Sequence, residues 1–214
     1  TLQKSAEKNK LYIIYEILSK LNCIDKKCFY CNKTLKEITI PRSIESIGQC
    51  SFYECKSLNI ISIPSTVVAI GSHAFCGCSL LTEIELPISL KSIGKSAFDG
   101  CSSLTKIKIP PMIIEIPECC FYGCSSLSQL SLPSSINIIR HHAFYGCSSL
   151  RTIYVPSLTS SIEKSIFKNC TLVSKIIIER PLDLITIDKY SFAECSSLTQ
   201  ISIPFSVTLI GESS

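Results

Sequence analysis

A spacing of 23 residues recurs along most of this 214-residue chain, and it constrains the fold more than any other feature of the sequence. Prolines and phenylalanines both keep that spacing. They are Pro41, Pro64, Pro87, Pro110, Pro133 and Pro156, and Phe52, Phe75, Phe98, Phe121, Phe144 and Phe167. A unit of this length is too small to bury its own apolar face. The repeats must therefore stack on one another, which predicts a solenoid.

The repeat divides the chain into two parts. Residues 23–214 are predicted to form about eight repeats, with a small insertion that moves the next landmarks to Phe192 and Pro204. Residues 1–22 lack the repeat, but Leu11, Ile14, Leu18 and Leu21 fall at helical spacing, which predicts an N-terminal helix. We expect this helix to cap the first coil, because an open end would expose core residues and strand edges. The last repeat stops before its phenylalanine, so we expect the chain to be a C-terminally truncated piece of a longer protein.

Composition excludes several classes of protein. The hydrophobic content of 46% is high enough to build a continuous core, so the chain is not a disordered tail. The net charge of +4 is spread without a basic run, which gives no support for nucleic-acid binding. No apolar stretch reaches the roughly 18 residues of a spanning helix, so this segment is not expected to insert into a membrane.

One unit, residues 104–126, shows how a coil is built. Ile107 and Ile109 alternate with Lys106 and Lys108, which is the period of a strand with one buried face. Pro110 ends that strand because it lacks a backbone donor. A second extended segment ends at residue 116, and a compact turn follows. The pattern predicts a mainly β fold, with a parallel sheet, short turns or 3-10 segments, and three sides to each coil.

Stacking in register turns each repeat position into a column, with equivalent residues about 4.8 Å apart. The phenylalanines are predicted to form one such column in the core. Its members are Phe52, Phe75, Phe98, Phe121, Phe144, Phe167 and Phe192.

The pattern Leu-x-x-Ile-x-Ile-Pro, then Ile-Gly-x-x-Ala-Phe-x-Gly-Cys-Ser-Ser-Leu, best seen in residues 81–104, resembles the BspA-type leucine-rich repeat. The resemblance implies a right-handed, curved solenoid. It also implies membership of a group that includes surface antigens and adhesins of bacteria and parasitic protists, which bind host or matrix proteins. Departures at Leu172-Val173 and at Glu179-Arg180-Pro181 predict a kink or bulge near residues 173–190.

Half of the 14 cysteines occupy one repeat position. They are Cys55, Cys78, Cys101, Cys124, Cys147, Cys170 and Cys195. Neighbours in this column would have β-carbons about 4.8 Å apart, beyond the usual 3.5 to 4.5 Å of a disulfide, so packing is favoured over bonding. Cys28 and Cys31 have the spacing of a zinc half-site, but a second such pair is absent, so no metal or other cofactor is predicted.

The outward residues of the first strand form two columns and are the natural docking surface. Tyr154 and Ile177 are expected to be exposed and adjacent, and an aromatic residue is a frequent binding anchor. A chance pair of apolar surface residues is the alternative. The other candidate binding residues are Glu83, Glu85, Lys106 and Lys108, for which ordinary cross-strand charge pairing is the alternative.

No catalytic residues are predicted, because the histidines fall in turns, the serines are repetitive, and nucleotide-binding or protease motifs are absent. The leading hypothesis is a non-catalytic module at the cell surface or outside the cell that binds a host or matrix protein. The rival is an intracellular, cytoplasmic scaffold or regulatory subunit with the same fold, which the many cysteines favour because thiols persist in reducing compartments.

Overall fold

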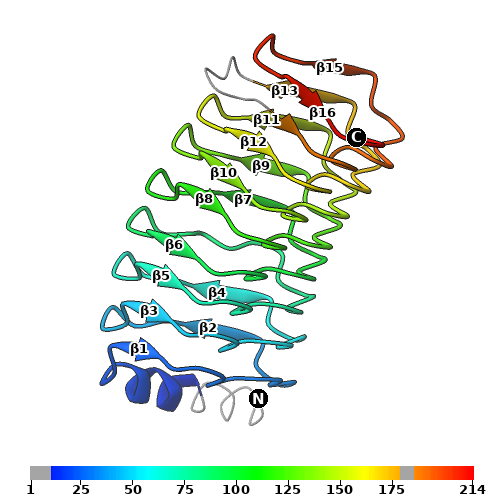
Figure 1. Cartoon of the computed structure of the whole chain (residues 1–214). Helices are drawn as coiled ribbons and strands as arrows, with labels where there is room; N and C mark the ends of the chain where they lie inside the picture. The colour runs from blue at the N-terminus through cyan, green and yellow to red at the C-terminus, as the bar shows by residue number, and fades with distance from the viewer. Residues whose placement is uncertain (1–10, 179–185) are drawn as a thin grey trace.

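The structure, a computed structural model, describes residues 11–178 and 186–214 as one stack of coils that curves along its axis (Figure 1). All of the strand pairs are parallel, which confirms the predicted solenoid. Most coils have a longer strand, a shorter strand and a turn segment, and the chain passes to the next coil after the turn; in the coil that contains β6, residues 83–85 take the place of the longer strand and form a single bridge.

The longer strands line one side of the solenoid. They are β2 (Glu37–Thr39), β4 (Ile60–Ser62), β7 (Lys106–Lys108), β9 (Gln129–Ser131), β11 (Thr152–Val155), β13 (Lys175–Ile178) and β15 (Gln200–Ser202). Their central residues point inward, as the alternation in the sequence predicts. Ile38 and Ile107, for example, are buried between exposed neighbours.

The shorter strands line a second side. They are β1 (Cys23–Ile24), β3 (Ser46–Ile47), β5 (Ala69–Ile70), β6 (Ser92–Ile93), β8 (Glu115–Ile116), β10 (Ile138–Ile139), β12 (Ser161–Ile162), β14 (Thr186–Ile187) and β16 (Leu209–Ile210). They form two sheets, in the orders β1-β3-β5-β6 and β8-β10-β12-β14-β16.

The interruption between β6 and β8 has a cause in the sequence. After most short strands, the next residue donates its backbone N–H to the coil before, as Gly94 does to the Ile70 carbonyl at 2.8 Å and Arg140 does to the Ile116 carbonyl at 2.9 Å. Pro117 occupies that position after β8. Because proline has no N–H, the bond to the carbonyl of Ile93 cannot form.

The third side is the turn segment, and it is also hydrogen-bonded from coil to coil. Phe52 donates its N–H to the Ala74 carbonyl, and Phe75 donates to the Ala97 carbonyl, both at 2.8 Å. Within the turn, Cys55 donates to the Phe52 carbonyl at 3.1 Å, an i to i+3 bond of the 3-10 type. The residue two after the phenylalanine has a positive φ, which glycine adopts without strain, as at Gly77 with φ of 75°.

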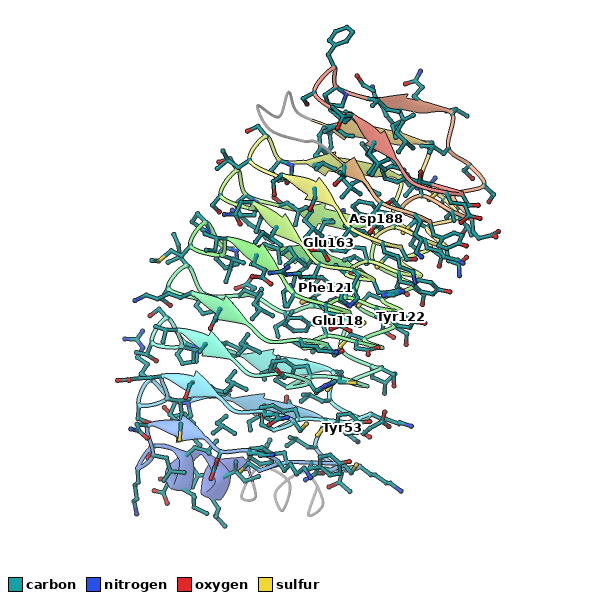
Figure 2. All side chains as sticks on the ribbon, viewed as in Figure 1. Tyr53, Glu118, Phe121, Tyr122, Glu163 and Asp188 are labelled. Carbon is teal, nitrogen blue, oxygen red and sulfur yellow. The ribbon has the colours of Figure 1, made fainter. Side chains whose placement is uncertain are left out.

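The phenylalanine rings form a continuous stack in the core. Successive centroids from Phe52 to Phe192 are 5.3 to 6.0 Å apart, and the rings are nearly parallel. Phe29 adds a further ring below Phe52 at 5.0 Å, although its side chain is only partly buried. Phe29 also keeps the 23-residue spacing, so the sequence analysis could have included it. In Figure 2, Phe121 lies inside the coil, whereas Tyr122 projects from its edge.

The predicted N-terminal helix is described from residue 11 to residue 18. Leu18 is buried, and Leu11 and Ile14 pack against the core of the first coils. These contacts involve three of the four apolar positions that the helical spacing marked. The prediction is wrong for Leu21, which is 45% exposed because the helix ends before it. The remaining residues of the predicted cap, 1–10, lie outside the described residues.

The insertion lies between β13 and β14. Val155 pairs with Ile178, a separation of 23 residues, whereas Ser161 pairs with Thr186, a separation of 25. The two extra residues are therefore between residues 178 and 186. The described strands on either side keep their register, and most of the region expected to kink, including Glu179-Arg180-Pro181, lies outside the described residues.

Candidate protein-binding face

The outward side chains of the longer strands and of residues 83–85 form one surface, which we call the long-strand face. On it, Glu83 lies opposite Lys106, and their side chains form an ion pair of 2.9 Å. Both side chains are more than half exposed, so the pair contributes little to stability. In the part of the chain that the structure describes, Glu85 and Lys108 form no ion pair. The charge-pairing alternative therefore fits Glu83 and Lys106 alone.

Tyr154 and Ile177 are direct cross-strand neighbours on this face. The Tyr154 side chain is 55% exposed, as expected. Ile177 is only partly exposed, so this residue is less exposed than the sequence predicts. The reason is its place in the middle of the three-stranded sheet, with Tyr154 on one side and Ser202 on the other.

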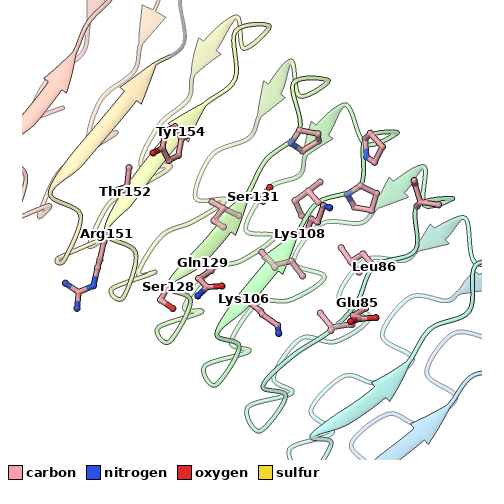
Figure 3. Close-up of a pocket in the computed structure, with 18 residues that line it drawn as sticks. Glu85, Leu86, Lys106, Lys108, Ser128, Gln129, Ser131, Arg151, Thr152 and Tyr154 are labelled. Atoms are coloured by element: carbon pink, nitrogen blue, oxygen red, sulfur yellow. The ribbon is translucent and has the colours of Figure 1, made fainter.

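A groove of about 920 Å³ crosses the long-strand face (Figure 3). It runs from the coil of residues 84–88 to Tyr154 in β11. Glu85, Lys106, Lys108 and Tyr154 line it, whereas Glu83 and Ile177 lie outside its lining. Four of the six candidate binding residues are thus brought together in one concave site.

Side-chain size explains why the surface is hollow here. Ser131 is small, and it occupies the column position between the long side chains of Lys108 and Tyr154. The strands β9 and β11 also belong to different sheets. Leu130 is consequently only partly buried, while Ile107 and Ile153 at the equivalent positions are at most 3% exposed.

The sequence analysis missed several residues that line the groove, because it considered only the alternating residues of the strands. Arg151 precedes β11, and Ile88 and Pro111 follow the strand positions of their coils. Ile88 is 72% exposed. Following every repeat position from coil to coil, and not only the strand positions, could have found them, since Ile88 and Pro111 are 23 residues apart.

The repeated cysteines line a different part of each coil, beneath the turn. Cys78 donates its Sγ–H to the Phe52 carbonyl of the previous coil at 3.2 Å, and the same bond recurs from Cys55 to Cys195 at 3.0 to 3.3 Å. Burial raises the pKa of the thiols, to about 11 at Cys55 and at Cys195. At pH 7 these thiols are neutral donors that link successive coils.

The sequence profile of the BspA type Leucine rich repeat region, in six copies, matches residues 22–139 and 114–214. The chain belongs to this family. The family and fold are typically non-catalytic and are consistent with a protein-interaction module. No curated protein gives a match.

Solved structures of other leucine-rich repeat proteins resemble this BspA-type chain. A leucine-rich repeat protein from Bacteroides ovatus is 34% identical, with a TM-score of 0.81 over 87% of this chain and 48% of that protein. A leucine rich cell surface protein from Faecalibacterium prausnitzii is 28% identical, with a TM-score of 0.71 over 87% of this chain and 60% of that protein. The chain therefore spans about half of the first relative and three fifths of the second.

A second polar cluster of the BspA-type solenoid lies along the short strands and the residues just after them. Its members are Lys95, Glu115, Glu118, Arg140, His141 and Glu163. Lys95 contacts Glu118 at 2.7 Å, and this bond holds the pKa of the Glu118 carboxyl below its usual value. His141 lies between Glu118 and Glu163, at 3.2 and 3.5 Å. These ion pairs join neighbouring coils through equivalent or nearly equivalent positions of the repeat.

The described residues of this BspA-type chain contain neither a cluster suited to a metal ion nor a helix suited to a membrane. Across residues 11–178 and 186–214, histidine, cysteine, aspartate and glutamate side chains nowhere gather in threes around a space suited to a metal ion. In the same two segments, no helix combines the length and apolar character needed to span a bilayer.

Proposed function

We propose that this segment is a non-catalytic protein-interaction module displayed at a cell surface, and that it binds a host or matrix protein through the long-strand face. The observation that carries the proposal is the groove across that face. It combines an exposed aromatic side chain, Tyr154, with Arg151 and an apolar wall, and aromatic residues and arginine are enriched in protein-binding surfaces.

One comparison supports the location. The F. prausnitzii relative is described as a leucine rich cell surface protein. The extended face also has the geometry that solenoids use to contact one large partner over several coils. A surface module of this kind needs no cofactor and no catalytic group.

Changing Tyr154 to Asp together with Ile177 to Asp tests the face. We expect capture from a panel of immobilised matrix and host-surface proteins to fall by about tenfold or more, because aromatic anchors contribute on the order of 2 kcal/mol to binding. Surface plasmon resonance measures the change. Leu80→Glu is the control, since Leu80 is 53% exposed and lies outside the groove.

If the folded double variant binds every captured protein with unchanged affinity, the long-strand face is not the binding surface. Circular dichroism and the melting temperature establish that the variant is folded. Loss of capture with Leu80→Glu as well would mean that binding depends on general surface charge or on another part of the solenoid.

The second candidate function is an intracellular scaffold or regulatory subunit. The column of cysteines favours it, because only a reduced thiol can donate a hydrogen bond to a phenylalanine carbonyl. Reduced thiols persist in the cytosol. The long-strand face could bind a partner in either compartment, so the redox state of the cysteines is the observation that distinguishes the two.

A further inference from the structure

The groove on the long-strand face has an unbalanced charge. From β7 to β13, the outward residues of the longer strands and the residues just before these strands include Lys106, Lys108, Arg151 and Lys175, and they include no aspartate or glutamate. Lys106 is paired with Glu83, but Lys108 and Arg151 have no carboxylate partner in the described chain. Two unpaired cations therefore line the groove, together with the single carboxylate of Glu85, which holds the same repeat position as Lys108 on the coil before it but forms no ion pair with it among the described residues.

The opposite wall of the groove is apolar. Leu86, Ile88, Pro110, Pro111 and Pro133 line it near the ends of the longer strands, as the group of proline rings in Figure 3 shows. Prolines have no N–H to offer, so this wall recognises shape and apolar surface more than polar groups. Tyr154 closes the groove at β11, and its ring is more than half exposed.

The small Ser131 leaves a hollow in the groove between its larger column neighbours, and we assign one apolar side chain of the ligand to it. Lys108 and Tyr154 stand on its two sides, and the partly exposed Leu130 lies at its base. The groove extends over four coils, or about 14 Å at the usual 4.8 Å spacing of strands. That length fits on the order of four or five residues of an extended peptide.

We propose that this groove binds an extended segment of the partner protein in which acidic residues flank an apolar side chain. The acidic side chains face Lys108 and Arg151, and the apolar side chain occupies the hollow over Ser131 between Lys108 and Tyr154. This inference rests on the proposed function and specifies the part of the partner that enters the face.

The apolar wall distinguishes this ligand from a polyanion. Sulfated polysaccharides and nucleic acids bind mainly through dense cationic surfaces and need no apolar contact. Here the cations are few and are spread over several coils, while half of the groove is lined by aliphatic and proline side chains. A peptide that carries both acidic and apolar side chains contacts the cations and the apolar wall at once.

Fluorescence anisotropy with labelled peptides tests the proposal. The probe is a short peptide with a central leucine flanked by aspartates. One comparison peptide has asparagines in place of the aspartates, and another has glycine in place of the leucine. We expect either replacement to weaken binding by about tenfold, and we expect the affinity of the probe to fall with added salt.

The matching protein variant is Lys108→Glu combined with Arg151→Glu. We expect it to bind the probe about tenfold more weakly, because two attractive contacts become repulsive. The control is Lys33→Glu combined with Lys91→Glu, which makes the same change in net charge at exposed lysines outside the groove and should leave binding unchanged. Equal melting temperatures establish that both variants are folded.

Three outcomes would overturn the inference. These are equal affinity for the asparagine peptide, absence of binding by the probe, and binding of a heparin oligosaccharide together with equal affinity for the glycine peptide. The last outcome would identify a polyanion surface. If Lys108→Glu with Arg151→Glu retains protein capture while Tyr154→Asp with Ile177→Asp abolishes it, the proposed function stands and the acidic segment is excluded.

Discussion

Each coil places one cysteine thiol against the phenylalanine carbonyl of the coil before it. The sequence predicted that these side chains stack, because their spacing is that of the repeat. It did not predict that they donate hydrogen bonds. That contact depends on the direction of the carbonyl, which the turn and its positive φ residues set and which residue types alone do not reveal.

The buried thiols predict sensitivity to alkali. Burial raises their pKa in the folded state to about 11 at Cys55 and at Cys195, above the value of about 8.5 in an unfolded chain. Their contribution to stability is therefore complete below pH 8.5 and is lost as the pH rises from 8.5 through 11. Urea denaturation from pH 7 to pH 11 should show a falling midpoint.

Alkylation by iodoacetamide at pH 8 provides the matching measurement. We expect the exposed Cys28 and Cys31 to react in the native protein and the column to react only after denaturation. Rapid native labelling of Cys101 or Cys124 would contradict this expectation. When denatured protein from the natural source is labelled without reductant, reaction at all 14 cysteines would favour the intracellular alternative, and several unreactive pairs would favour the surface.

The strands, as elements, follow from alternation and proline position, and the sequence predicted both sets. The sequence indicates less clearly where the pairing between successive strands is interrupted. Pro117 explains the break between β6 and β8, because it lacks the backbone N–H that most coils donate at this position. Residues 83–85 have a pattern similar to that of β7, yet they form only one bridge. The ion pairs of the short strands were missed because only the columns of the longer strands were considered.

The Lys95 and Glu118 pair predicts a small loss of stability in acid. The pKa of Glu118 is lowered in the folded state, chiefly by the bond from Lys95 and then by His141. Its contribution is present above the unfolded pKa and is lost as the pH falls through the lower, folded value. Glu118→Gln should therefore reduce the melting temperature slightly at pH 7 and have a smaller effect at pH 3.

Thermal melts of the wild type and the variant at both pH values check this expectation. Glu45→Gln is the control, because Glu45 is exposed and forms no ion pair among the described residues. A difference between wild type and Glu118→Gln that is as large at pH 3 as at pH 7 would show that the side chain acts through packing and not through charge.

At the scale of the whole molecule, each coil contacts only its neighbours, so its stability depends on its position in the stack. Phe98 is fully buried between two rings, whereas Phe192 is 7% exposed and is the last ring of the stack. Phe98→Ala should lower the free energy of unfolding by about 3 to 5 kcal/mol, and Phe192→Ala should lower it by less. Chemical denaturation of the two variants compares them.

Equal losses at the two positions would show that the coils unfold as one unit in which position has no effect. A larger loss at Phe192 would show that the C-terminal coils control unfolding of the rest.

The sequence predicted the solenoid and the three sides of its coils, because one period determines both. It predicted some of the residues that line the groove but not the groove itself. Lys108 and Tyr154 were identified from their columns, but the hollow between them depends on the small Ser131 and on the separation of β9 from β11. The strands β9 and β11 have the same 23-residue spacing as the paired strands, so the sequence pattern does not indicate that their pairing stops.

The sheets are interrupted at three places among the described residues. On the short-strand side the break lies between β6 and β8, and on the long-strand side the breaks lie between β4 and β7 and between β9 and β11. At each break another side of the coil stays bonded: β5 pairs with β6, β10 pairs with β12, and Phe98 donates its backbone N–H to the Cys120 carbonyl in the turns. Tension applied along the axis of the described coils would therefore meet intact backbone bonds at every interruption, so none of them forms a complete fracture plane.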